Sequence, residues 1–172
     1  MKQEKSKISV LMSVYKKENP EYLRASLESI LVQTRTADEI LLIEDGPLTQ
    51  ELYQVVAEYQ KKCDYLHVHA MEQNVQLGRA LAKGVELCQY DLIARMDTDD
   101  IAMPHRLEKE GAYMEAHPEV DVVGGAIREF NDEGTIDRVK NMPKTQEEIL
   151  EYVKVRNPLN HMTVIYFKSG KL

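Results

Sequence analysis

Residues 8–14 read Ile-Ser-Val-Leu-Met-Ser-Val, and this stretch decides the fold class. A strand with one face in water alternates apolar and polar residues, whereas five of these seven side chains are apolar. Such a run is typical of a parallel strand that helices cover on both faces. The stretch therefore predicts a central strand of an α/β sheet.

The segment behind this strand predicts a helix. Asn19 is a good amino-terminal cap, and Pro20 suits the first helical position. The apolar residues that follow recur at the spacing of one buried helical face: Leu23, Leu27, Ile30 and Leu31.

The strand-then-helix pattern then repeats three more times. Further strands are predicted at residues 39–44, 66–71 and 91–96. Thr49 caps the helix after the first of these, and Pro104 opens the helix after the last. Four such units predict a mainly parallel sheet with helices on both faces, which is a three-layer α/β sandwich.

The pattern changes in the last third of the chain. A fifth strand is predicted at residues 120–127, a hairpin turn at 132–134 and a last strand at 162–167. Thr145 and Glu148 have the spacing of a capping box for a short helix. With 172 residues and no linker or repeat, residues 1–172 are expected to form a single domain.

The charge of the chain restricts the classes of partner that it can bind. The formal net charge of −7, without a block of Lys and Arg, argues against nucleic acid as a partner. A small anion stays compatible if a cation or local donors offset the repulsion. Cys63 and Cys88 are expected to be reduced, and the first apolar run is too short to cross a bilayer, so we expect a cytoplasmic protein.

Three predicted strands end in polar residues. The first ends at Ser13 and Tyr15, the second at Asp45 and the fourth at residues 97–100, Asp-Thr-Asp-Asp. In open α/β sheets, ligands bind beyond the carboxyl ends of the strands. These residues are therefore the candidates for a binding site.

The run at residues 97–100 carries the strongest signal, because Asp97, Asp99 and Asp100 repel one another. At about 5 Å and an effective dielectric constant near 20, each pair costs about 3 kcal/mol. A divalent cation removes this cost, and Mg²⁺ or Mn²⁺ suits carboxylates that share the ion with phosphate oxygens. A hydrated acidic loop or an acidic helix terminus would explain the same residues without a metal.

Three other residues, Asp45, Arg79 and His161, have two interpretations each. Asp45 either forms a turn before Gly46 or accepts hydrogen bonds from a base or a ribose. Arg79 is either a surface charge or a donor aimed at a nucleotide, and His161 is either structural or part of the site. Glu44 is expected to face solvent.

Taken together, these segments resemble glycosyltransferase family 2, the inverting enzymes with the GT-A fold. The resemblance covers about residue 7 to the end of the chain, and the order and spacing of its motifs are specific. The matching stretches are residues 8–15, 29–34, 39–46 and 74–81, then 94–100 as a DxD-type motif with 104–107 behind it, and 157–161.

The resemblance implies a role for each site residue. The nucleotide of a nucleotide-sugar donor would be contacted by Ser13, Tyr15, Asp45 and Arg79. Asp99 would bind a divalent cation, Mn²⁺ or Mg²⁺, with Asp97 on the metal or the ribose. Asp100 and His161 complete the donor site.

Two departures from the family pattern matter. Gln76 and Ala82 stand where the family often has Gly and Asn. The family's catalytic base lies on a segment beyond the stretch that matches residues 162–167, so we expect no catalytic base within this chain and a base downstream of Leu172. A chain without that segment is expected to transfer sugar poorly.

The expected partners are a nucleotide-sugar, most simply UDP-linked, and a saccharide or lipid-linked glycan acceptor. Self-association into a homo-oligomer and peripheral attachment at the inner face of the membrane stay open.

The rival interpretation is a nucleotide-sugar-binding module without activity. A phosphoacceptor receiver domain lacks support because Tyr15, Lys16 and Lys17 follow the first strand, and a sugar nucleotidyltransferase would need a Gly-rich loop there.

Overall fold

The computed structural model of the chain describes residues 5–131 and 137–168. Its first two thirds follow the predicted alternation of strands and helices. The strands are β1 (Ile8–Val14), β2 (Glu39–Glu44), β3 (Leu66–Ala70) and β4 (Leu92–Arg95). The helices behind them are α1 (Pro20–Leu31), α2 (Gln50–Lys62), α3 (Leu77–Leu87) and α4 (Arg106–Ala116).

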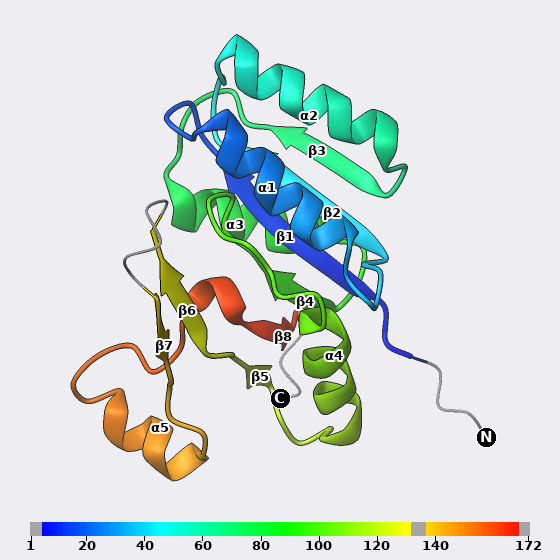
Figure 1. The fold of residues 1–172 in the computed structure, drawn as a ribbon. Helices are drawn as coiled ribbons and strands as arrows, with labels where there is room; N and C mark the ends of the chain where they lie inside the picture. Colours follow the sequence, from blue (N-terminus) through cyan, green and yellow to red (C-terminus); the bar gives the residue numbers. More distant parts are fainter. Residues whose placement is uncertain (1–4, 132–136, 169–172) are drawn as a thin grey trace.

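These strands form one sheet in the order β3-β2-β1-β4-β8-β5, with β1 near its middle (Figure 1). The strands from β3 to β4 pair in parallel. The late strand β8 (Ile165–Phe167) lies antiparallel between β4 and β5 (Val122–Val123). The predicted mainly parallel α/β sheet is confirmed.

Helices cover both faces of the sheet, which gives three layers. Apolar residues of α1, α2 and α4 pack in one core cluster with alternate residues of β1, among them Val10 and Met12. On the other face α3 packs in a second cluster with Leu11 of β1. A side chain at Gly84 of α3 would meet Leu11 Cδ1 at 2.4 Å, so glycine lets the helix lie close to the sheet.

The helix starts follow local chemistry. Asn19 caps α1 by accepting from the Glu21 backbone, Pro20 is its first residue, and Thr49 caps α2 in the same manner. Helix α4 begins at Arg106 rather than at Pro104, because the Pro104 carbonyl accepts from the Thr34 backbone N–H outside the helix. This ties the start of α4 to the loop after α1.

The fifth strand predicted at residues 120–127 is wrong in its extent. Only Val122 and Val123 join the main sheet, and residues 127–130 form β6 (Ile127–Phe130) in a separate antiparallel pair with β7 (Asp137–Lys140). The break falls at Gly125, whose backbone N–H and C=O bond to the Thr163 hydroxyl instead of a neighbouring strand. The predicted turn at residues 132–134 lies outside the described residues.

The last predicted strand is also shorter than expected. Residues 161–163 form a 3₁₀ turn, η1 (His161–Thr163), because the Thr163 backbone N–H and hydroxyl both donate to the Asn160 carbonyl. Helix α5 (Gln146–Tyr152) begins with the predicted capping box of Thr145 and Glu148. Within residues 5–131 and 137–168, no helix is long and apolar enough to cross a membrane.

Candidate active site

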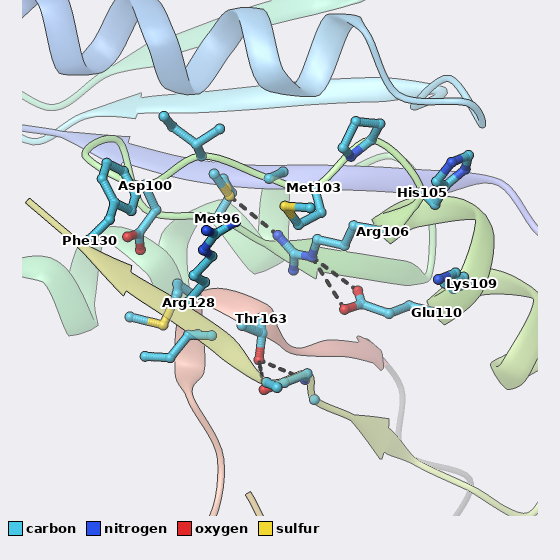
Figure 2. Close-up of a pocket in the computed structure, with 18 of the residues that line it drawn as sticks. Met96, Asp100, Met103, His105, Arg106, Lys109, Glu110, Arg128, Phe130 and Thr163 are labelled. Atoms are coloured by element: carbon cyan, nitrogen blue, oxygen red, sulfur yellow. Dashed lines mark hydrogen bonds and ion pairs between the residues drawn. The ribbon is translucent and has the colours of Figure 1, made fainter. Parts of the chain in front are cut away.

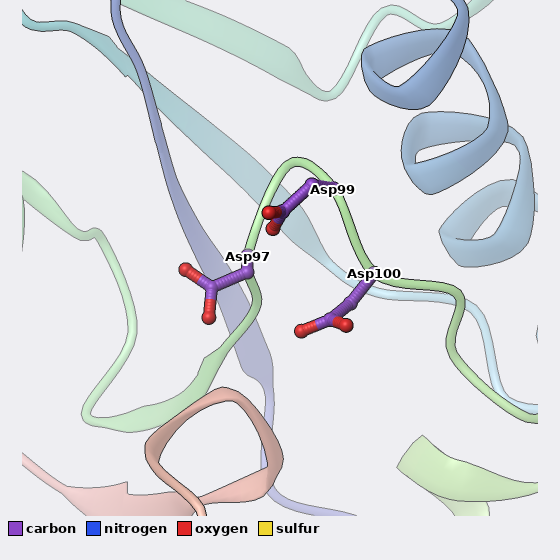
Figure 3. A group of neighbouring side chains, drawn as sticks. All are labelled: Asp97, Asp99 and Asp100. Atoms are coloured by element: carbon purple, nitrogen blue, oxygen red, sulfur yellow. The ribbon is translucent and has the colours of Figure 1, made fainter. Parts of the chain in front are cut away.

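The acidic run lies on the turn that follows β4, at the carboxyl edge of the sheet. Asp97, Asp99 and Asp100 each place a carboxylate oxygen within 4.8 Å of the others. Figure 3 shows the three side chains on this turn, with their carboxylates gathered on one side of it. The sequence placed these residues together correctly, and the structure adds that Asp99 is exposed whereas Asp97 and Asp100 are half-buried.

The surroundings of Asp100 disfavour the charged form of its carboxyl. Burial, followed by the charges of Asp97 and Asp99, raises the pKa of the Asp100 carboxyl, and Arg95 and His161 oppose that rise. Its Oδ2 atom is buried and has no hydrogen-bond partner among the described residues. Clustered carboxylates with an unsatisfied buried oxygen fit a hard divalent cation, which oxygen ligands bind.

The turn is tied to the loop after β1. The buried Thr98 hydroxyl donates to Glu18 Oε2 at 2.7 Å and lies 3.3 Å from the Ser13 carbonyl oxygen. Tyr15 lies between Ser13 and Glu18 in the sequence, and its side chain is 43% exposed and therefore accessible to a ligand. The sequence reading missed Thr98 and Glu18, and the one signal for Thr98 was its place between two aspartates.

Asp45 lies at the end of β2 and is almost fully buried. Its Oδ1 accepts from the Val75 backbone N–H at 2.6 Å, and its Oδ2 accepts from Asn74 Nδ2 at 3.0 Å. Gly46 behind it has a φ of 81°, and a side chain there would lie 2.5 Å from the Asn74 nitrogen. Asp45 therefore holds the loop before α3 against the end of β2.

The expectation that Glu44 faces solvent is wrong. Glu44 is 6% exposed, because β2 lies between β1 and β3 with helices on both faces. Burial raises the pKa of its carboxyl.

The amino end of α3 carries Arg79 and the residue that departs from the family pattern. Arg79 is exposed, and its side chain makes no hydrogen bond or ion pair within the described parts of the chain. Gln76, the cap residue of α3, has a φ of 72°, in the left-handed region that favours glycine. This backbone conformation explains why glycine suits this position.

His161 reaches the acidic cluster from the far end of the sequence. Its Nε2 lies 3.9 Å from Asp97 Oδ2, and its side chain is 53% exposed. The η1 turn places it there because β8, just behind the turn, pairs with β4. The structure therefore brings His161 to the cluster, and its role, structural or in donor binding, stays a prediction.

A cavity of about 880 Å³ adjoins the cluster on the side of α4 and β6 (Figure 2). Asp100 lines it together with apolar side chains such as Met103 and Phe130. Arg106 and Glu110 form an ion pair at 3.1 Å in its wall, and burial raises the pKa of the Glu110 carboxyl to about 7 against the opposing effect of Arg106. Sequence patterns do not predict this cavity, because the residues that form it are spread over positions 96–163.

Comparison with known proteins agrees with this fold. The Glycosyl transferase family 2 profile matches residues 9–170, so the chain belongs to this family. The solved structure of S. aureus TarS in complex with UDP-GlcNAc has a TM-score of 0.72 and 21% identity, over 94% of this chain and 45% of that one. This likeness confirms the GT-A type of fold expected from the sequence.

Curated relatives are closer in sequence. The amylovoran biosynthesis glycosyltransferase AmsE of Erwinia amylovora is 44% identical, over 94% of this chain and 60% of its own length. The UDP-Gal:alpha-D-GlcNAc-diphosphoundecaprenol beta-1,3-galactosyltransferase of Escherichia coli is 34% identical, over 98% of this chain and 61% of its own length. The chain thus spans about 60% of the length of these relatives.

The hydrogen bonds of Asp45 generate a prediction about stability. In Asp45→Ala the Val75 backbone N–H loses its acceptor, and we expect the free energy of unfolding to fall by about 1–3 kcal/mol. Asp45→Asn keeps an acceptor oxygen for Val75 and should lose less. Urea unfolding of the three proteins measures both changes. Equal stability of Asp45→Ala and the parent would show that Asp45 does not hold this loop.

Proposed function

We propose that the chain binds a UDP-linked sugar through a divalent cation at Asp97 and Asp99, as the donor site of a glycosyltransferase. The observation that carries the proposal is the gathering of three carboxylates within 4.8 Å at the carboxyl edge of the sheet. Family membership supports nucleotide-sugar chemistry. The names of the E. coli relative and of the TarS complex support uridine as the nucleoside.

In this proposal each residue has a stated role. Asp99 and Asp97 hold Mn²⁺ or Mg²⁺, and the bound cation supplies a Lewis acid that stabilises the departing diphosphate. Asp45 binds the base or ribose with the lone pairs that Asn74 and Val75 leave free. The remaining donor contacts come from the loops after β1 and β4, the start of α3 and η1: Ser13, Tyr15, Arg79, Asp100 and His161.

The loop after β1 and the turn after β4 have to act together for such a donor to bind. The Thr98 hydroxyl couples them through Glu18 and Ser13. The nucleoside of the donor on the β1 loop and its diphosphate at the acidic cluster would then stay at a fixed distance from each other. This coupling supports binding of one ligand across both loops.

The cation generates the first test. UDP is an anion and the protein carries a net charge of −7, so UDP should bind more tightly with Mn²⁺ than with a chelator. Asp99→Ala removes a charged ligand, and we expect a loss of about 1.5–3 kcal/mol, or at least about tenfold in affinity. Isothermal calorimetry measures both effects.

The matched control is Asp64→Ala, which removes an exposed aspartate between α2 and β3, and it should bind UDP like the parent. Equal UDP affinity with Mn²⁺ and with chelator would remove the cation from the proposal. A folded Asp99→Ala that binds like the parent would show that the cation lies elsewhere.

We also propose that the acceptor, a saccharide or a lipid-linked glycan, binds in the cavity beside Asp100. The cavity adjoins the cluster, and its apolar side chains suit the C–H faces of a sugar or the start of a lipid chain. The chain spans about 60% of its relatives' length. The place where the whole protein binds its acceptor is therefore also a proposal.

A substitution that fills the cavity tests the acceptor proposal. Met103 lines the cavity and is 68% exposed, so Met103→Trp should narrow the cavity and raise the acceptor KM at least several-fold while UDP affinity stays the same. Val155→Trp, at an exposed position outside the cavity lining, is the control. The assay follows transfer from UDP-galactose to a lipid-linked GlcNAc diphosphate, the pair named for the E. coli relative.

Unchanged acceptor kinetics in Met103→Trp would place the acceptor elsewhere. UDP binding with no transfer at all by the parent, not even the poor transfer that we expect, would favour the alternative, a nucleotide-sugar-binding module without activity of its own. The family match favours the transferase.

A further inference from the structure

Arg95, the last residue of β4, has a side chain that the packing of the protein does not explain. It is 4% exposed, yet Nε and both terminal nitrogens of its guanidinium have no hydrogen-bond partner among residues 5–131 and 137–168. Its side-chain polar contact in that part of the chain is an ion pair with Asp97 Oδ1.

A second arginine shows what a structural role looks like. Arg35 is also largely buried, and its guanidinium donates to the Ser6 carbonyl and to Glu115 Oε1, the latter at 2.8 Å. Arg95 has a single ionic partner, Asp97, and no backbone acceptor among the described residues. A buried charge without hydrogen bonds costs stability, and apolar side chains in place of both members of a buried ion pair are often as stable or more stable. Arg95 therefore needs a reason other than stability.

The position of Arg95 supplies that reason. Asp97 binds Arg95 through Oδ1 and faces His161 with Oδ2, while its backbone carbonyl accepts from the Ser26 hydroxyl at 2.8 Å. The carboxylate is thus held through Oδ1 by a buried side chain, and its second oxygen lies 3.9 Å from His161 Nε2. Without this hold, repulsion from Asp99 and Asp100 would turn Asp97 away.

We propose that Arg95 is a positioning residue, which fixes Asp97 in the orientation that lets the three carboxylates bind one cation. The proposal rests on the cation site of the proposed function. Groups that orient a metal ligand typically change metal affinity by about 10–100-fold when they are removed.

Charge and positioning make opposite predictions here. Arg95 is a cation beside a cation site, so its charge alone weakens metal binding, and its removal would tighten it. Its hold on Asp97 strengthens metal binding, and its removal would weaken it. The sign of the change therefore separates the two effects.

The test is Arg95→Met, which keeps an unbranched side chain of similar length and removes the charge and the contact with Asp97. Mn²⁺ affinity is measured from the electron paramagnetic resonance signal of free Mn²⁺, with and without UDP, and stability by urea unfolding. We expect Mn²⁺ affinity to fall by about 10–100-fold, and stability to fall as well because Asp97 loses its ionic partner.

Arg35→Met is the matched control, because it breaks the Arg35–Glu115 pair and the hydrogen bond to Ser6, which lies two residues ahead of the start of β1 at Ile8. It should lose stability and keep the Mn²⁺ affinity of the parent. If Arg95→Met binds Mn²⁺ as tightly as the parent or more tightly, the positioning role is wrong. If the parent itself binds no Mn²⁺ with or without UDP, the cation site is wrong and the role of Arg95 with it.

Discussion

The mutual repulsion of three carboxylates on one turn is the constraint on which the rest of this site depends. Asp97, Asp99 and Asp100 lie within 4.8 Å of one another, and the pKa of Asp100 is raised as a result of burial and of the two neighbouring charges. Repulsion among these carboxylates would open the turn if other parts of the fold did not hold it. The Ser26 hydroxyl of α1 and the Thr98 hydroxyl, with its partner Glu18, hold it from two sides.

The sheet places these holding groups within reach. Because β1 lies between β2 and β4 and all three run in parallel, the loops that follow them meet at one edge. The late strand β8 pairs with β4 and brings His161 to the same place from the far end of the chain. The site thus depends on contacts between segments more than 60 residues apart, such as His161 with Asp97.

Local patterns were sufficient to predict the first four strands and their helices. Each of these features is local in the sequence: the residues of one apolar run, of one helix cap such as Asn19 or Thr49, or of one polar strand end lie within a few positions of one another. The acidic cluster and the fold class were therefore predictable, and Asp45 was recognised, although its hydrogen bonds to Asn74 and Val75 were not.

The last third was harder to predict, because distant partners decide its structure. Gly125 leaves the sheet to bond with Thr163, which splits one predicted strand into β5 and β6. The cavity beside Asp100 and the burial of Glu44 and Arg95 depend in the same way on packing between elements. The roles given to Ser13, Tyr15, Arg79 and His161 stay predictions, since the structure places these residues without showing what they bind.

The most direct measurement of the central claim is anomalous X-ray diffraction from crystals of the protein grown with UDP and Mn²⁺. We expect one manganese peak at coordination distance from Asp99, with Asp97 beside it and the UDP diphosphate on its other side. UDP bound at this edge of the sheet without manganese at the carboxylates, or manganese at another position, would contradict a cation site at the acidic cluster.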